Sequence, residues 1–171
     1  MKSANQSVQD YGAGVVANED SGFSYQRCWV MESDAQDDES VIAGLMGYPQ
    51  THATIPDMDR QPDFLKPIVA LERQTAGAWY IHAIATKPGY RCRGFAAGLL
   101  DYAKERANEN GCEEMALVVN SENKHACDLY ERAGFLDYDK QAAVSLPGLP
   151  LSGNWVLMKK TLEAADAAPR F

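Results

Sequence analysis

The feature that most constrains the fold is a strand-like run, a turn of small and basic residues and an amphipathic helix, in that order along residues 79–111. The run Trp79–Thr86 is rich in aromatic and β-branched residues, and Lys87-Pro88-Gly89 ends it as a turn. Apolar residues then recur at helical spacing as far as the helix stop Asn110-Gly111, namely Phe95, Leu99, Leu100, Ala103 and Ala107. The sequence therefore predicts a strand that leads through a tight turn into a helix N-terminus.

The turn between this strand and this helix has the composition of an anion site; it consists of Arg91, Cys92, Arg93, Gly94, Phe95 and Ala96. The first turn of a helix has N–H groups without helical partners and the positive end of the macrodipole, and both suit an anion. Gly94 and Ala96 let a phosphate approach the backbone, and Arg91 and Arg93 can add charge-assisted contacts. The simple alternative is a helix N-terminus with solvated charges. On its own, the turn is compatible with a pyrophosphate site.

A second segment lies about thirty residues downstream. The strand-like run Met115–Asn120 precedes a short helix that is capped near residues 121–123 and stopped at Gly134. The pattern Arg-x-x-Gly-x-Ala at residues 91–96, followed by Asn-x-x-Ala-x-x-Leu-Tyr-x-x-x-Gly-Phe at residues 123–135, resembles the GCN5-related N-acetyltransferase superfamily. The resemblance is strongest over residues 79–138 and extends over about residues 24–162.

The resemblance implies an α/β (α+β) acyl-CoA N-acyltransferase fold, with a mixed, mostly antiparallel sheet that is flanked by helices and splayed at its fourth and fifth strands. We expect one domain over residues 1–171, with a core at about residues 20–162 and a flexible tail at 163–171. Family members begin with a strand and a helix, and Val8–Asn18 is a poor helix because it contains glycines. We therefore expect these first elements to be reduced or missing. The exposed sheet edge that results would favour a homodimer.

The resemblance also implies a function, which is direct transfer of an acetyl group from acetyl-CoA to a primary amine of a small molecule or protein. A non-catalytic acyl-CoA sensor or regulatory module is the alternative, and another phosphate ligand in the turn is a third reading. None of the motifs identifies the acceptor amine.

Residues for the donor follow from the resemblance. The pyrophosphate is expected on the backbone amides of residues 92–96, beside the Arg91 and Arg93 side chains. The pantetheine arm is expected to run along the strand at Ile84, Ala85 and Thr86 and to touch Asn123. Cys92 is interpreted as a tolerated small residue, because the family transfers the acetyl group without an acyl-enzyme.

Three side chains are candidate catalytic residues, namely Tyr130, His82 and Tyr80. Tyr130 occupies the position of the tyrosine that the family uses as general acid towards the coenzyme A sulfur, although a packing tyrosine would satisfy the same pattern. His82 is the candidate base, since a neutral imidazole can accept a proton at physiological pH. Strict alternation would place Tyr80, His82 and Ile84 on one face of the strand. The run His-Ala-Ile-Ala resembles the His-Ala-Leu-Ala of arylalkylamine N-acetyltransferases, whose histidine is implicated in base catalysis, and Tyr80 of this chain matches the histidine that precedes it in those enzymes. The alternative for His82 is a buried structural histidine.

Composition bears on the partners, the metal content and the location of the protein. The chain has 171 residues, 46% of them apolar, and a formal net charge of −8, which argues against a nucleic-acid surface and would favour a cationic amine. Its four cysteines stand singly and the acidic pattern at residues 57–63 lacks the other ligands of a calcium loop, so we expect no metal. No apolar run is long enough to span a bilayer and the first residues lack the apolar core of a signal peptide, so we expect a cytoplasmic protein.

Further elements are predicted outside the two motifs. Residues 24–32 and 40–48 are expected to form a hairpin around the acidic turn 34–39. Within the long connection 49–77, Pro67 is expected to begin a helix that ends near Gly77. The connection as a whole is expected to form a lid or pocket wall. Residues 135–144 and 154–162 are expected to be the last strands.

Overall fold

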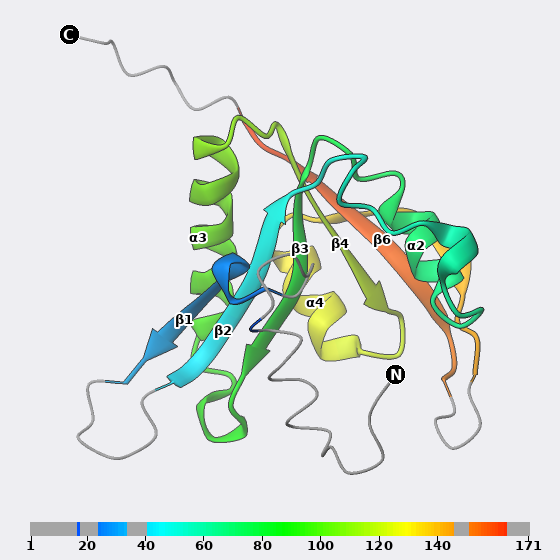
Figure 1. Ribbon diagram of the computed structural model, residues 1–171. Helices are drawn as coiled ribbons and strands as arrows, with labels where there is room; N and C mark the ends of the chain where they lie inside the picture. The colour runs from blue at the N-terminus through cyan, green and yellow to red at the C-terminus, as the bar shows by residue number, and fades with distance from the viewer. Residues whose placement is uncertain (1–16, 18–23, 34–40, 146–150, 164–171) are drawn as a thin grey trace, which may run out of the picture.

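The computed structural model describes residues 17, 24–33, 41–145 and 151–163, and its six strands form one sheet in the order β1-β2-β3-β4-β6-β5 (Figure 1). Only β3 and β4 pair in parallel; the other neighbours are antiparallel. The strands are β1 (Cys28–Glu32), β2 (Val41–Pro49), β3 (Trp79–Thr86), β4 (Glu114–Asn120), β5 (Leu136–Ala142) and β6 (Asn154–Thr161). The helices are α2 (Lys66–Glu72), α3 (Phe95–Glu109) and α4 (Lys124–Arg132), with short 3₁₀ turns η1 (Tyr25–Arg27), η2 (Met58–Arg60) and η3 (Pro88–Tyr90).

Apolar cores cover both faces of the sheet. On one face α3 and α4 pack on a core that includes Trp79 and Ile81 of β3 and Leu99, Ala103 and Tyr130 of the helices. On the other face α2 lies over β4, β5 and β6, and Tyr80 and Leu71 belong to a second core (Figure 1). Alternation along the strands produces this division, because successive side chains point to opposite faces.

The parallel pair β3–β4 parts along its length. Pairing covers Trp79 to Ile81 of β3 and Met115 to Leu117 of β4, and both strands then continue without pairing to each other. These are the third and fourth strands of the described chain, and they occupy the place of the predicted splay. The C-terminal half of β3 therefore presents a backbone edge towards the opening.

A β-bulge interrupts the pairing of β2 with β3 at His82. Met46 faces Ala83 and the next residue, Gly47, faces Ile81, so His82 is an extra residue on β3. A bulge reverses the side-chain alternation of the residues beyond it. Ile84 therefore packs against the core under α3, and the prediction that it shares a face with Tyr80 and His82 is wrong.

Most element bounds agree with the sequence, and two predictions need correction. Residues 25–27 are a 3₁₀ turn rather than strand, since the Ser24 hydroxyl accepts a hydrogen bond from the Gln26 N–H. The helix that contains Pro67 ends at Glu72, five residues before Gly77. The predicted turn 34–39, the tail after residue 163 and the predicted weak helix at residues 8–18, apart from Ala17, lie outside the described residues. None of the helices in the described ranges is long and apolar enough to cross a membrane.

Candidate active site

The predicted anion turn has an unusual backbone. Gly94 is the N-cap of α3 at a φ of +86°, and Cys92 has a φ of +59°, the only positive φ of a non-glycine residue in the described chain. Left-handed conformations cost little for glycine, which explains Gly94 at this position. Gly94 has no side chain with which to cap the helix, and the turn is exposed from Arg91 to Gly94. The first-turn amides of α3 therefore face a site that an anion can approach.

The two arginines of this turn are held differently. The Arg91 Nε–H donates a hydrogen bond to the Thr86 carbonyl oxygen at 3.2 Å, which ties the turn to the end of β3. The Arg93 guanidinium lies over the Tyr90 ring, 5.4 Å from its centroid. Both side chains are exposed. The structure thus brings the predicted phosphate turn and the predicted pantetheine edge, Ile84 to Thr86, next to each other.

Tyr130 and Asn123 come from α4. Tyr130 is buried in the core under α3, and its ring meets Phe135 edge to face with centroids 6.0 Å apart. Burial raises the pKa of its phenol above the usual value of 10, so the hydroxyl keeps its proton at neutral pH. Asn123 is exposed and its Oδ1 accepts a hydrogen bond from the Ala126 N–H at 3.3 Å, as the N-cap of α4.

The opposite face of β3 holds a cluster of aromatic rings around His82. The His82 ring stacks on Tyr48 at 6.3 Å between centroids and meets the Tyr80 ring at 5.8 Å. The Tyr80 hydroxyl donates a hydrogen bond of 2.9 Å to Oε1 of Glu72, a carboxyl group that is only 5% exposed. The Arg27 guanidinium lies 4.5 Å from the centroid of the Tyr48 ring. β3, β2, α2 and η1 each contribute to this cluster.

The pKa shifts in the cluster favour the neutral forms of its titratable side chains, which are His82, Tyr80, Tyr48 and Glu72. Burial, and then the nearby charge of Arg27, lower the pKa of His82 below 6.5. Burial and the Glu72 carboxylate raise the pKa of Tyr80 well above 10, and burial followed by Glu72 raises the pKa of Tyr48 to about 12. Burial raises the pKa of Glu72, against the hydrogen bond from Tyr80. A neutral imidazole is therefore favoured at physiological pH.

Sequence reasoning missed three members of this cluster, which are Arg27, Tyr48 and Glu72. Glu72 lies at the end of a helix in a long connection, and nothing in its local sequence marks it as buried. Tyr48 faces Tyr80 across the β2–β3 pair, but this register follows from the bulge at His82 and cannot be read from spacing alone. Arg27 reaches the cluster only because the chain turns at η1.

The other histidines, the cysteines and the acidic residues of the segment 57–63 have ordinary surroundings. His52 and His125 are exposed, and the four cysteines are free thiols. Asp57 caps η2, and Asp63 accepts a hydrogen bond of 2.6 Å from Lys66. No group of three or more histidine, cysteine or acidic side chains within the described ranges is arranged to hold a metal ion.

These features define a class of fold, a mixed sheet that parts at one strand pair beside the predicted anion turn at a helix N-terminus. The chain belongs to the Acetyltransferase (GNAT) family, whose model matches residues 6–135. The family that the motifs predicted is thereby confirmed.

Individual relatives cover less of the chain. It is 41% identical over 64 residues to the N-alpha-acetyltransferase MAK3 of Arabidopsis thaliana, which is 37% of this chain and 33% of that protein. It is 36% identical over 58 residues to the thialysine N-epsilon-acetyltransferase of Bos taurus, 34% of either chain. The chain thus matches about a third of the length of these curated relatives.

Solved structures confirm the fold. A mosquito arylalkylamine N-acetyltransferase, like 5b, superimposes with a TM-score of 0.67 at 17% identity, over 92% of this chain and 82% of that one. At this identity the likeness establishes the architecture of the sheet and helices.

Proposed function

We propose that the protein is an N-acetyltransferase that moves an acetyl group from acetyl-CoA directly to a primary amine of a small molecule or protein. The observation that carries the proposal is the parting of β3 from β4, which places an open strand edge between the anion turn and the His82 cluster. Membership of the family and the names of both curated relatives, which are N-acetyltransferases, support it.

The donor would be held by backbone groups. The first-turn amides of α3, around Cys92 to Ala96, suit the pyrophosphate, and exposed Arg91 and Arg93 can add charge. The edge of β3 at Ile84 to Thr86 can pair with an extended pantetheine arm as a further strand would. The Thr86 hydroxyl is buried and has no hydrogen-bond partner in the described part of the chain, so a polar group of the arm would satisfy it.

His82 would accept the proton of the amine. In the reaction the amine nitrogen attacks the thioester carbonyl carbon, the C–N bond forms, and the carbonyl oxygen gains negative charge until the C–S bond breaks. The amine must lose a proton in this sequence, and the lowered pKa of His82 keeps its imidazole available as acceptor. Tyr80 would act as a positioning residue. Its hydroxyl group already donates a hydrogen bond to Glu72, and the Tyr80 ring contacts the His82 ring.

Tyr130 would supply the proton for the leaving thiolate. Its raised pKa keeps the phenol protonated, as a general acid requires. Tyr130 belongs to the core under α3 whereas His82 lies with the rings on the other face of the sheet. In this proposal an acceptor and a donor would meet these two groups from opposite faces, through the opening between β3 and β4.

The test compares Tyr130→Phe with the wild type in single-turnover acetylation and in calorimetric titration with acetyl-CoA. We expect the transfer rate to fall about 100-fold, the usual contribution of one acid–base group, with donor affinity nearly unchanged. Tyr138→Phe is the matched control, because Tyr138 is exposed on β5. Equal transfer rates in Tyr130→Phe and wild type would remove the acid role. If the protein binds acetyl-CoA but transfers no acetyl group to any amine of a broad panel, it is a sensor module and not an enzyme.

A further inference from the structure

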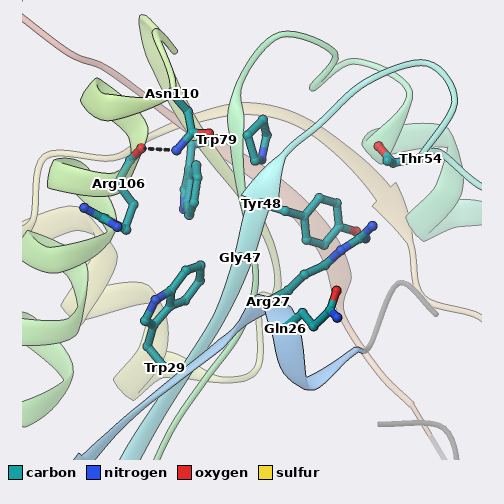
Figure 2. Close-up of a pocket in the computed structure, with 10 residues that line it drawn as sticks. Gln26, Arg27, Trp29, Gly47, Tyr48, Thr54, Trp79, Arg106 and Asn110 are labelled. Carbon is teal, nitrogen blue, oxygen red and sulfur yellow. Dashed lines mark hydrogen bonds between the residues drawn. The ribbon is translucent and has the colours of Figure 1, made fainter. Parts of the chain in front are cut away.

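A notch lies at the edge of β2, away from the anion turn. β1 pairs with β2 only as far as Cys28 opposite Met46, so Gly47, Tyr48 and Pro49 extend beyond it. η1, this edge of β2 and the C-terminal end of α3 border an open cavity of about 330 Å³ (Figure 2). The anion turn lies at the opposite, N-terminal end of α3.

The walls of the notch combine flat aromatic rings with polar and charged side chains. Trp29, Tyr48 and Trp79 contribute aromatic rings, and Pro49 adds an apolar ring. Gly47 lets the Trp79 indole pack directly on the β2 backbone, because a Cβ atom there would lie 2.9 Å from Nε1 of Trp79 and 3.1 Å from the Tyr80 carbonyl oxygen. A volume of this size lies at the lower end of the range for small-molecule sites.

Two buried hydrogen-bond donors without acceptors belong to residues that line this space. Trp79 is 2% exposed, and its Nε1–H has no partner in the described residues; Nε of Arg106 is buried and unpartnered in the same way. Figure 2 shows the Trp79 indole between Arg106 and the backbone at Gly47. Arg106 also ion-pairs with Glu109 through Nη2, and Arg27 brings a second guanidinium to the notch.

The charge of the lining contrasts with that of the chain. The lining contains two arginines and no acidic residue, in a protein whose formal net charge is −8. Buried donors that lack acceptors cost free energy, and an anionic oxygen is the acceptor that binds guanidinium groups best. The flat aromatic walls add a preference for a planar body behind that anion.

We propose that the notch is a second binding site, which binds a small carboxylate with a flat apolar body. The bound carboxylate acts on His82 through Arg27. The link is structural: Arg27 covers the Tyr48 ring, and Tyr48 stacks on His82. Among the described residues, the charged or titratable groups near His82 include Arg27 from η1, Tyr48 from β2 and Tyr80 from β3, and Glu72 from α2 lies behind Tyr80. A carboxylate on Arg27 offsets the positive charge that this residue places near the imidazole.

The binding experiment titrates benzoate, and separately its neutral isostere benzamide, into the full chain without acetyl-CoA or amine. We expect benzoate to bind and to change the tryptophan fluorescence, and benzamide to bind at least about tenfold more weakly. Arg106→Gln and Arg27→Gln should each weaken benzoate binding about tenfold. Lys104→Gln, which removes one positive charge from an exposed position of α3, should not change it.

Three outcomes would overturn the site: no benzoate binding, equal binding of benzoate and benzamide, or wild-type affinity in both arginine variants. Circular dichroism checks the folding of each variant, and Arg106→Lys, which keeps the charge but removes the Nε donor, decides the point if Arg106→Gln does not fold. These measurements do not depend on the proposed acetyltransferase activity.

The coupling to His82 rests on the proposed function and has its own test. Saturating benzoate should move the acidic midpoint of the kcat/KM profile to higher pH in the wild type and leave it in place in Arg27→Gln. An unchanged wild-type midpoint would overturn the coupling.

Discussion

Burial and the charge of Arg27 together keep the His82 imidazole neutral. A base can accept a proton only in its neutral form, so a lowered pKa extends activity to lower pH. We expect the acidic midpoint of kcat/KM to lie below pH 6.5 in the wild type and to rise towards that value in Arg27→Gln, measured with one amine. Arg60→Gln, exposed on η2, is the control and should keep the wild-type midpoint. If Arg27→Gln also keeps it, Arg27 does not tune this histidine.

At the scale of elements, α2 brings a buried acid to the proposed acceptor face. Pro67 lies in its first turn, where a missing N–H costs nothing, and its position over β4, β5 and β6 sets Glu72 beside Tyr80. Glu72→Ala leaves the buried Tyr80 hydroxyl without an acceptor, and we expect a loss of about 1–3 kcal/mol in the free energy of unfolding at pH 7. Urea denaturation measures it, and a loss much smaller than this would contradict the role of Glu72.

The pH dependence of Glu72→Gln follows from the raised pKa of Glu72. A carboxyl whose pKa is higher in the folded state stabilises the fold below its unfolded value of 4.5, and this contribution is lost as the pH rises through the folded value. Glutamine does not titrate. The free energy of unfolding of Glu72→Gln, relative to wild type, should therefore increase from about pH 4 to about pH 8 in urea denaturation. A constant difference over that range would show that Glu72 does not titrate differently in the folded state.

The turn that starts α3 allows a matched pair of glycine substitutions. Gly94 and Gly134 have φ values of +86° and +88°, so alanine at either position costs about 1–2 kcal/mol of backbone strain. Neither substitution brings a Cβ into a close contact, since the nearest atom to the Gly134 position is at 3.7 Å. Only Gly94→Ala should also weaken acetyl-CoA binding in calorimetry, because only Gly94 borders the amides of the turn. Equal affinity for acetyl-CoA in both variants would show that its pyrophosphate does not bind at this turn.

At the scale of the whole molecule, the described sheet ends on β1, which pairs with β2 on one side only. The outer strand exposes Val30, at 56%, and an unpaired edge is a template for a second chain. We predict a homodimer that forms through this edge, with a mass by light scattering of twice that of the chain. Val30→Lys should shift the mass to that of one chain, and a monomeric wild type would refute the prediction.

Local signals predicted the fold well where they were dense. β3 has the bounds predicted for it, α3 buries the predicted residues Leu99, Leu100, Ala103 and Ala107, and α4 begins directly after its N-cap Asn123 and stops before Gly134. These features depend on propensity, capping and periodicity over a few residues, which a sequence displays directly. The roles of Tyr130, His82 and Tyr80 remain predictions.

Residues close together in the chain were enough to predict the family, the turn at residues 91–96 and the strand that carries His82. The groups around His82, by contrast, depend on tertiary contacts. One extra residue in β3 turned Ile84 to the other face, and α2 and η1 brought Glu72 and Arg27 to the rings. Strand register and the docking of a distant helix depend on contacts between residues far apart in sequence, and spacing along the chain does not specify those contacts.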